Sequence, residues 1–224
     1  MSLRAAAQEY ATRHRLRAWE ALPWAAGLAV FFLFPNHLAF GTQVLITILF
    51  ALSLDLVLGY AGIVTLGHAA FFGAGAYTVG MLAAHAGWSE PLTGLLAAAA
   101  VAGAVGLVSG WVLLRTHGLT LLMLTLCTMA LLEQAANMGA AWTGGFDGMP
   151  GLSFKPILDL FAFDVLYFRT QYLYALAVLL AGFLLVRTLV HSSFGRSLTG
   201  IRENLLRMHA IGAPVRARQV LVYA

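Results

Sequence analysis

The chain has 224 residues, of which 61% are hydrophobic and only 10% are charged, and its formal net charge is +4. A soluble domain carries roughly 25% charged residues, so this composition excludes an ordinary soluble protein. The one lysine, Lys155, follows Phe154, which excludes a GxxxxGK phosphate loop, and the one cysteine, Cys127, excludes an internal disulfide and a cysteine metal cluster.

Six apolar runs are long enough to cross a hydrocarbon core of about 30 Å, which takes roughly 20 residues per helix. The sequence therefore predicts an all-α protein, a polytopic transmembrane helical bundle of about six spans. The first run is the weakest, because Pro35 lies near its end. In chain order the runs cover residues 22–40, 43–60, 66–86, 91–115, 117–138 and 172–190.

The basic residues orient these spans, because cytoplasmic loops are enriched in arginine and lysine. With six spans, every basic residue except Lys155 and Arg169 falls on one side of the membrane. We therefore expect residues 1–21 to form a cytoplasmic N-terminal tail. The spans, with an external loop at about 139–171, fill residues 22–190. Residues 191–218 return to the cytoplasm. The inside arginines are Arg4, Arg13, Arg15, Arg17, Arg115, Arg187, Arg196, Arg202, Arg207, Arg216 and Arg218.

Residues 59–80 are dense in glycine and also hold a histidine and two tyrosines. Glycine costs up to about 1 kcal/mol relative to alanine inside a helix, so this density predicts a broken or re-entrant segment, or helices that cross at backbone contact. Unwound backbone at membrane depth lines a cavity or is buried in protein, and transport paths are commonly built that way. A packing seam in which the histidine bonds a neighbouring carbonyl is the alternative. The candidate path residues are Gly59, Tyr60, Gly62, His68, Gly75 and Tyr77.

The fourth run is dense in alanine and glycine, with Gly106 and Gly110 in small-xxx-small spacing. This spacing lets two helix backbones approach closely. We therefore expect tight helix packing at these two glycines.

Two carboxylates lie inside apolar runs, Asp55 in the second and Glu133 in the fifth. A charge within a span costs about 2.5 to 3.5 kcal/mol on insertion scales, so each is a candidate for lining a solute route. Both lie near an end of their run, so interfacial hydration or internal hydrogen bonding is the alternative.

Residues 193–214 fit a short amphipathic helix that stops at Gly212 and Pro214. Its apolar stripe needs a partner, and three partners are open on chemical grounds: a groove on another protein, the membrane interface, or the protein's own spans. The stripe consists of Leu198, Ile201, Leu205 and Met208, and the other faces carry Arg202, Glu203 and Arg207.

Four stretches occur in a specific order: residues 51–77, residues 117–126, the sequence TGGFDG at 143–148, and residues 193–204 followed by Gly212. In this order they resemble the branched-chain amino acid ABC transporter permeases of the LivH/LivM type, and the LivM branch fits better. The resemblance covers most of the chain from about 44 to 218.

The resemblance implies a transmembrane permease subunit of an ATP-binding cassette importer for branched-chain or other hydrophobic amino acids. Such a subunit is not an enzyme and needs no cofactor, because ATP is bound by a separate ATP-binding subunit. The resemblance adds Thr143, Gly144 and Gly145 to the path. Of the three possible partners of the apolar stripe, it favours a groove of the ATP-binding subunit. It assigns ATPase coupling to Gly195, Arg196, Ile201, Arg202, Glu203 and Gly212.

Further partners are implied in the same way: a second permease subunit, an extracytoplasmic solute-binding protein and the lipid bilayer of the bacterial cytoplasmic (inner) membrane. No nucleic acid is expected, because the basic residues follow the topology and do not form one aromatic-laced patch. Permeases for urea or another small amide or acid occur in the same family and are an alternative.

Two further classes of function compete with an importer. An ion- or proton-coupled secondary carrier would need coupling sites such as Asp55 or Glu133, and ionophore sensitivity of uptake would identify it. An intramembrane hydrolase using Ser109 or His68 would need a GxSxG elbow, an HExxH motif or a set of nucleophile, base and orienting group, and the sequence offers none.

Residues 219–224 begin another apolar run. The permeases that the chain resembles continue with further helices after this point. We therefore expect a permease that lacks the C-terminal helices, with residues 219–224 as the start of a further span.

Overall fold

The computed structural model of the chain describes residues 21–149, 151, 152, 154, 156 and 168–224. Every regular element within these residues is a helix, which confirms the all-α prediction. The expected N-terminal tail, apart from residue 21, lies outside the described residues, as does Lys155 with much of the expected external loop.

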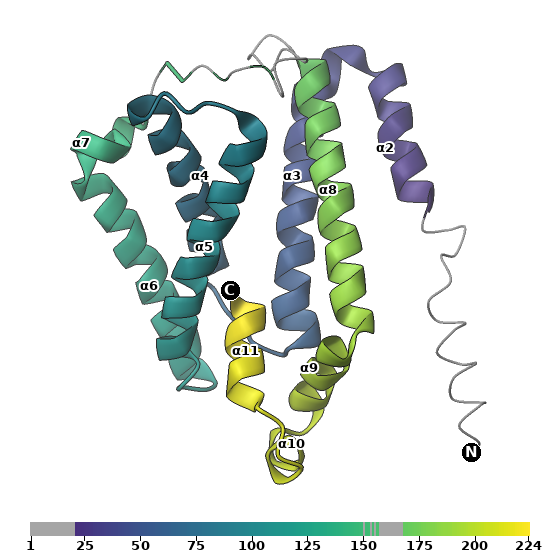
Figure 1. The fold of residues 1–224 in the computed structure, drawn as a ribbon, viewed down its shortest axis with the longest axis vertical. Coiled ribbons are helices and arrows are strands. Elements are labelled where there is room, and N and C mark those ends of the chain that lie inside the picture. Colours follow the sequence, from purple (N-terminus) through teal and green to yellow (C-terminus); the bar gives the residue numbers. More distant parts are fainter. Residues whose placement is uncertain (1–20, 150, 153, 155, 157–167) are drawn as a thin grey trace.

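Helices follow all six predicted spans, and they alternate in direction along the chain (Figure 1). Within the described residues, four stretches are long and apolar enough to cross a membrane: Pro35–Tyr60, Pro91–Leu113, Leu119–Met138 and Phe168–His191. The six helices are α2 (Leu22–Leu33), α3 (Leu38–Asp55), α4 (His68–His85), α5 (Pro91–Leu113), α6 (Leu119–Met138) and α8 (Phe168–His191).

The first predicted span, residues 22–40, is not one helix. α2 ends at Leu33, Phe34 leaves the helical region with φ −128° and ψ 60°, and a 3-10 turn, η2 (Pro35–His37), leads into α3. Pro35 is the physical cause, because it has no backbone N–H and disfavours helical geometry in the residue before it. The 12 residues of α2 reach about 18 Å, which is short of a hydrocarbon core.

The glycine-rich stretch contains a break in the helical structure, as predicted. α3 passes into a π-helical turn, η3 (Leu56–Tyr60), and the next helix, α4, begins at His68. Residues 61–67 between them are not helical, and buried and exposed residues alternate along them. Gly62 has φ +69°, a left-handed conformation that glycine adopts without strain, and it turns the chain out of η3.

The 61–67 segment is fixed against α6 at Thr125, whose side chain is fully buried. The backbone N–H of Leu66 donates to Thr125 Oγ1 at 3.2 Å. Gly67 lies so close to α6 that a Cβ at position 67 would be 2.6 Å from the carbonyl oxygen of Thr125. Close approach of two backbones therefore explains one glycine of this stretch.

Replacing Thr125 with valine tests whether this contact stabilises the break. The variant leaves the N–H of Leu66 without its acceptor, and we expect a loss of about 1 to 3 kcal/mol in the free energy of unfolding. Thr128→Val on the same helix is the control, since Thr128 bonds only the carbonyl of Leu124. Thermal unfolding in detergent measures both variants, and equal unfolding temperatures would contradict the assigned role of Thr125.

The long helices form two groups. In one, α3 packs along α8 and α2 lies beside them, around a core that includes Leu38 and Tyr172. The phenol of Tyr172 donates to the carbonyl of Gly27 in α2 at 2.8 Å. In the other group α4 packs along α5, with α6 beside α4.

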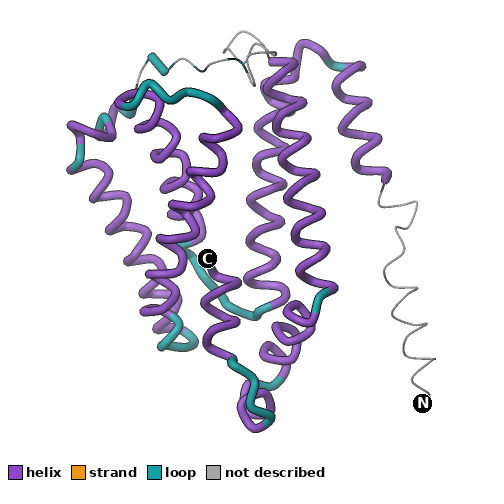
Figure 2. The backbone as a smooth tube through the Cα atoms, viewed as in Figure 1, coloured by secondary structure: helices purple, strands orange, loops and turns teal. Residues whose placement is uncertain are grey.

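The two groups are joined at the base of the molecule by three short helices (Figures 1 and 2). These helices are α9 (Ser193–Glu203), α10 (Leu205–Ala210) and α11 (Val215–Tyr223). Leu198 and Ile201 of α9 are 0% and 3% exposed, and Leu198 shares a core with Val57 of η3 and Tyr223 of α11.

The predicted tight contact at Gly106 and Gly110 is confirmed, and α11 is the helix that makes it. A Cβ at Gly106 would lie 2.7 Å from Cα of Ala224, and a Cβ at Gly110 would lie 2.8 Å from Cδ1 of Tyr223. The two glycines therefore provide the shallow surface on α5 that receives α11.

Candidate functional site

A cavity of about 450 Å³ lies between α4, α5, α6 and the short helix α7 (Ala140–Thr143). Its wall is mostly alanine, glycine, methionine, leucine and valine, with a few polar side chains. Three of these polar residues, Tyr77, Glu133 and Thr143, are predicted path residues that come from three different helices. A small, largely apolar cavity with few polar groups is the usual form of a site for a small solute.

Glu133 is the one carboxylate among the described residues that line this cavity. Its side chain makes no hydrogen bond or ion pair with any described residue, so both oxygens are available to a solute. Glu133 is exposed, and its carboxylate can attract a cationic group such as an ammonium through opposite charge. The cavity is therefore suited to a small molecule with an ammonium group and an apolar side chain.

The TGGFDG sequence forms a compact turn after α6, and only its threonine reaches the cavity. Thr143 Oγ1 donates to the carbonyl of Gly139 at 2.9 Å and accepts from the N–H of Gly145 at 3.3 Å. Gly144 has φ +77°, and a Cβ there would collide with the carbonyl of Gly148. Gly144 and Gly145 therefore shape the turn and do not line the cavity.

The six other predicted path residues, including His68, also lie away from this cavity. Gly75 packs on α5, where its Cβ would lie 3.6 Å from Cβ of Ala98, so it belongs to a helix seam. Asp55, Gly59 and Gly62 lie at the base, beside α9. The predicted path residues therefore do not form one group: some line the cavity, and others lie at a contact at the base. Tyr60, in η3, does not line the cavity either.

Arg202 of α9 lies on the broken segment. Its Nη1 donates to the carbonyl of Gly59, and its Cγ occupies the place beside Gly62 where a Cβ would come within 2.6 Å. On the other side of the same turn, a Cβ at Gly59 would collide with the carboxylate of Asp55. A predicted coupling residue is therefore in direct contact with two predicted path residues, of which Gly59 is 143 positions away in the chain.

His68 joins α3 to α4 and does not line the cavity. Its Nε2 lies 2.8 Å from Ser53 Oγ, and Ser53 donates its own proton to the carbonyl of Phe50 at 2.7 Å. Nε2 is therefore the donor to Ser53, which leaves Nδ1 as a buried acceptor with no partner among the described residues. The expected bond to a neighbouring carbonyl is replaced by this bond to a hydroxyl.

The tail after α8 differs from the single amphipathic helix that the spacing predicts. Asn204, with φ −155° and ψ 96°, ends α9, and its side chain accepts from the N–H of Arg207 at 2.9 Å to begin α10. The stripe residues Leu198 and Ile201 are buried within the chain itself, so their side chains are not exposed to a groove on another protein in this structure. Of the three open partners, the protein's own spans cover this part of the stripe.

The remaining coupling candidates occupy different positions. Gly195 is buried at the corner between α8 and α9, where a Cβ would collide with the carbonyl of Val190. Arg196 and Glu203 are exposed on α9, and Gly212, with φ +76°, turns the chain between α10 and α11.

The sequence reasoning missed the exposed apolar surface of α10. Leu206 is 80% exposed and Ile211, which follows the helix, is 69% exposed. α10 forms the lowest point of the base (Figure 1). Asn204 was the available signal, since asparagine is a common first residue of a new helix.

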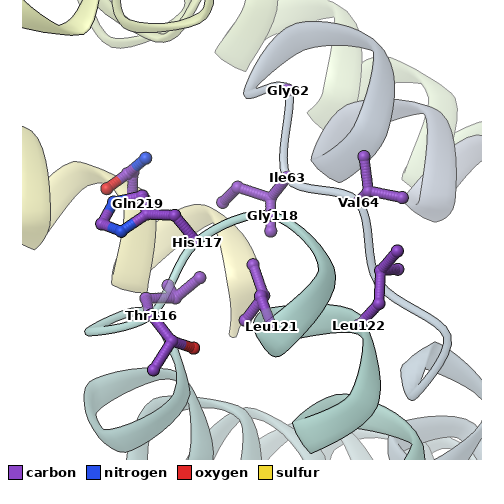
Figure 3. Close-up of a pocket in the computed structure, with 10 residues that line it drawn as sticks. Gly62, Ile63, Val64, Thr116, His117, Gly118, Leu121, Leu122 and Gln219 are labelled. Carbon is purple, nitrogen blue, oxygen red and sulfur yellow. The ribbon is translucent and has the colours of Figure 1, made fainter.

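Two adjoining cavities at the base were also not predicted. The smaller, about 230 Å³, is lined by residues of the 61–67 segment, the α5–α6 turn and α11, with His117 and Gln219 at its edge (Figure 3). The larger, about 380 Å³, shares those two residues and adds Arg115, His209 and Arg216.

A family model described as "Branched-chain amino acid transport system / permease component" matches residues 36–224. The high-affinity branched-chain amino acid transport system permease protein LivM of Salmonella typhimurium strain LT2 is 29% identical over 203 residues, which are 79% of this chain and 46% of that protein. LivM of Escherichia coli strain K12 is 29% identical over 200 residues, 78% and 46% of the two chains. The chain thus spans about half the length of these relatives. No solved structure gives a significant match.

Proposed function

The chain belongs to the family of branched-chain amino acid transport permeases, and from this we propose that it forms a solute path in an ATP-binding cassette importer. The importer carries branched-chain or other hydrophobic amino acids across the bacterial cytoplasmic membrane. The ATP is bound and hydrolysed by a separate subunit. A second permease subunit and an extracytoplasmic solute-binding protein complete the assembly.

The cavity between α4, α5 and α6 is the observation that carries this proposal. Its one described carboxylate, Glu133, is placed to attract the ammonium of an amino acid, and the alanine and methionine wall suits an aliphatic side chain. Urea has neither an ammonium nor an apolar side chain, so this cavity favours hydrophobic amino acids over urea.

We infer that the base faces the cytoplasm, because Arg115 and the arginines of α9, α10 and α11 gather there and cytoplasmic loops are enriched in arginine. The exposed residues Leu206, on α10, and Ile211, directly after it, then offer an apolar surface to the ATP-binding subunit. We infer that Arg202 transmits movement of α9 to the broken segment, because its side chain contacts Gly59 and Gly62.

Uptake into proteoliposomes tests the proposal. We expect the chain, reconstituted with its ATP-binding, second permease and solute-binding subunits, to import leucine only with ATP, and ionophores to leave the uptake unchanged. Uptake that needs no ATP and stops with an ionophore would identify a secondary carrier. Uptake of urea without leucine would identify the alternative solute class.

Gly73 allows the role of the cavity to be tested separately from folding. It lines the cavity, and a Cβ at this position would meet no other atom within 4 Å. Gly73→Ala therefore keeps leucine uptake, whereas Gly73→Leu fills the cavity and lowers the apparent affinity by about tenfold or more, equivalent to about 1.4 kcal/mol. Thermal unfolding should be similar for both variants. Normal leucine uptake by a folded Gly73→Leu protein would show that the solute passes elsewhere.

A further inference from the structure

The larger cavity at the base has an unusual concentration of positive charge. It is formed by the end of α5, the α5–α6 turn, α10 and the start of α11. None of the described residues that line it is acidic. The side chains that can donate hydrogen bonds into it are Arg115, His117, His209, Arg216 and Gln219.

Both arginines are held in place by Trp111. The guanidinium carbon of Arg115 lies 4.3 Å from the centroid of the Trp111 ring, and that of Arg216 lies 5.9 Å from it. Nη2 of Arg216 also donates to the backbone carbonyl of Trp111 at 3.0 Å. Two cations beside one ring repel each other, and an anion bound between them would relieve that repulsion.

The face of α5 that leads to this cavity is apolar and exposed. Val108, Trp111 and Val112 lie on one side of the helix, at three- and four-residue spacing, and all three are more than half exposed. Trp111 is also the kind of residue that is enriched where the hydrocarbon core meets the headgroups. A molecule with an anionic head and apolar tails would therefore contact the basic cavity and this strip of α5 at the same time.

We propose that this cavity binds the headgroup of an anionic phospholipid, with Arg115 and Arg216 contacting the phosphate and the acyl chains lying along α5. Basic pockets between transmembrane helices on the cytoplasmic side are suited to such headgroups. The position in the cytoplasmic leaflet rests on the orientation proposed above, but the binding chemistry does not depend on the transported solute. Since His209 belongs to α10, the lipid lies against the helix offered to the ATP-binding subunit.

Lipid binding to the purified 224-residue chain in detergent tests the proposal without any transport assay. Native mass spectrometry follows titrations with phosphatidylglycerol, with phosphatidylcholine and with inorganic phosphate. We expect phosphatidylglycerol to bind about tenfold more tightly than phosphatidylcholine, because only the former carries a net negative charge. Inorganic phosphate should not displace it, because phosphate lacks the contacts along α5.

Charge-matched variants locate the binding site. Arg115→Gln with Arg216→Gln should lower phosphatidylglycerol affinity about tenfold, to the level of phosphatidylcholine, and the corresponding double lysine variant should keep most of it. Arg207→Gln with Arg218→Gln removes the same charge from residues that do not line the cavity, and it should bind as the unchanged protein does. Unchanged binding by the Arg115 and Arg216 glutamine variant would overturn the proposal.

A second measurement covers the case in which the glutamine variant does not fold. Brominated phosphatidylglycerol should quench the fluorescence of Trp111 in the unchanged protein, so Trp111→Phe should remove part of the quenching. Equal quenching in both proteins, equal affinity for the two lipids, or full displacement by inorganic phosphate would each overturn a lipid site here.

Discussion

In the ATP-driven importer that we propose, replacing Arg202 with alanine is expected to separate ATP hydrolysis from transport. The variant leaves the carbonyl of Gly59 without this donor and empties the space beside Gly62, so α9 loses the Arg202 contacts with the broken segment. Coupling between two sites is typically worth about 1 to 3 kcal/mol. We therefore expect uptake per ATP hydrolysed to fall about tenfold or more, measured as parallel uptake and phosphate release.

Two further variants assign this effect to the contact and not to the lost charge. Arg202→Lys keeps one donor and an aliphatic stem, so it should recover part of the coupling, although it cannot reproduce the planar fork of arginine. Arg218→Ala removes a positive charge from the neighbouring helix α11 and should leave the ratio of uptake to hydrolysis unchanged. If all three variants transport normally, Arg202 has no part in coupling.

Replacing Gly195 with alanine is expected to destabilise the protein and to lower transport. A Cβ at this position would collide with backbone atoms of Leu189 and Val190 in α8, which cannot rotate away as a side chain can. Forcing extra atoms into such a site typically costs about 1 to 3 kcal/mol. The corner between α8 and α9 must then open, and this movement displaces Arg202 from Gly59. Both the unfolding temperature and the uptake should decrease.

Gly200→Ala is the matched control for this prediction, because it makes the same change within the same helix. A Cβ at position 200 would meet Sδ of Met208 at 3.0 Å, and this flexible side chain can move aside. The gain in helix propensity on replacing glycine with alanine is similar at the two positions, so it does not contribute to the difference between the variants. A Gly195→Ala protein as stable as Gly200→Ala would show that the corner is not tightly constrained.

The sequence predicted the parts of the fold that depend on local properties. Apolar run length located all six helices, glycine density located the break before His68, and the spacing of Gly106 and Gly110 indicated a close helix contact. The first run was predicted too long, since residues up to 40 were assigned to it although Pro35 is a strong local signal against a helix.

The arrangement of the site was less predictable. Tyr77, Glu133 and Thr143 share a cavity, whereas Asp55, Gly59 and Gly62 lie together at the base near Arg202 of α9. Helices that are apolar on all sides give no periodic signal for which face meets which neighbour. The amphipathic stripe of α9 was visible, but its chemistry suits a partner protein, a membrane surface and the protein's own spans alike.

The sequence by itself therefore determined that this chain is a helical membrane protein and where its six apolar helices lie. These properties follow from hydrophobicity, backbone sterics and charge, which each residue brings with it. Only the tertiary structure decided that Arg202 contacts Gly59, that Arg115 and Arg216 share Trp111, and that Glu133 faces a cavity. Apart from Arg115 with Trp111, these contacts join distant segments, and they depend on helix rotation and packing that local sequence does not specify.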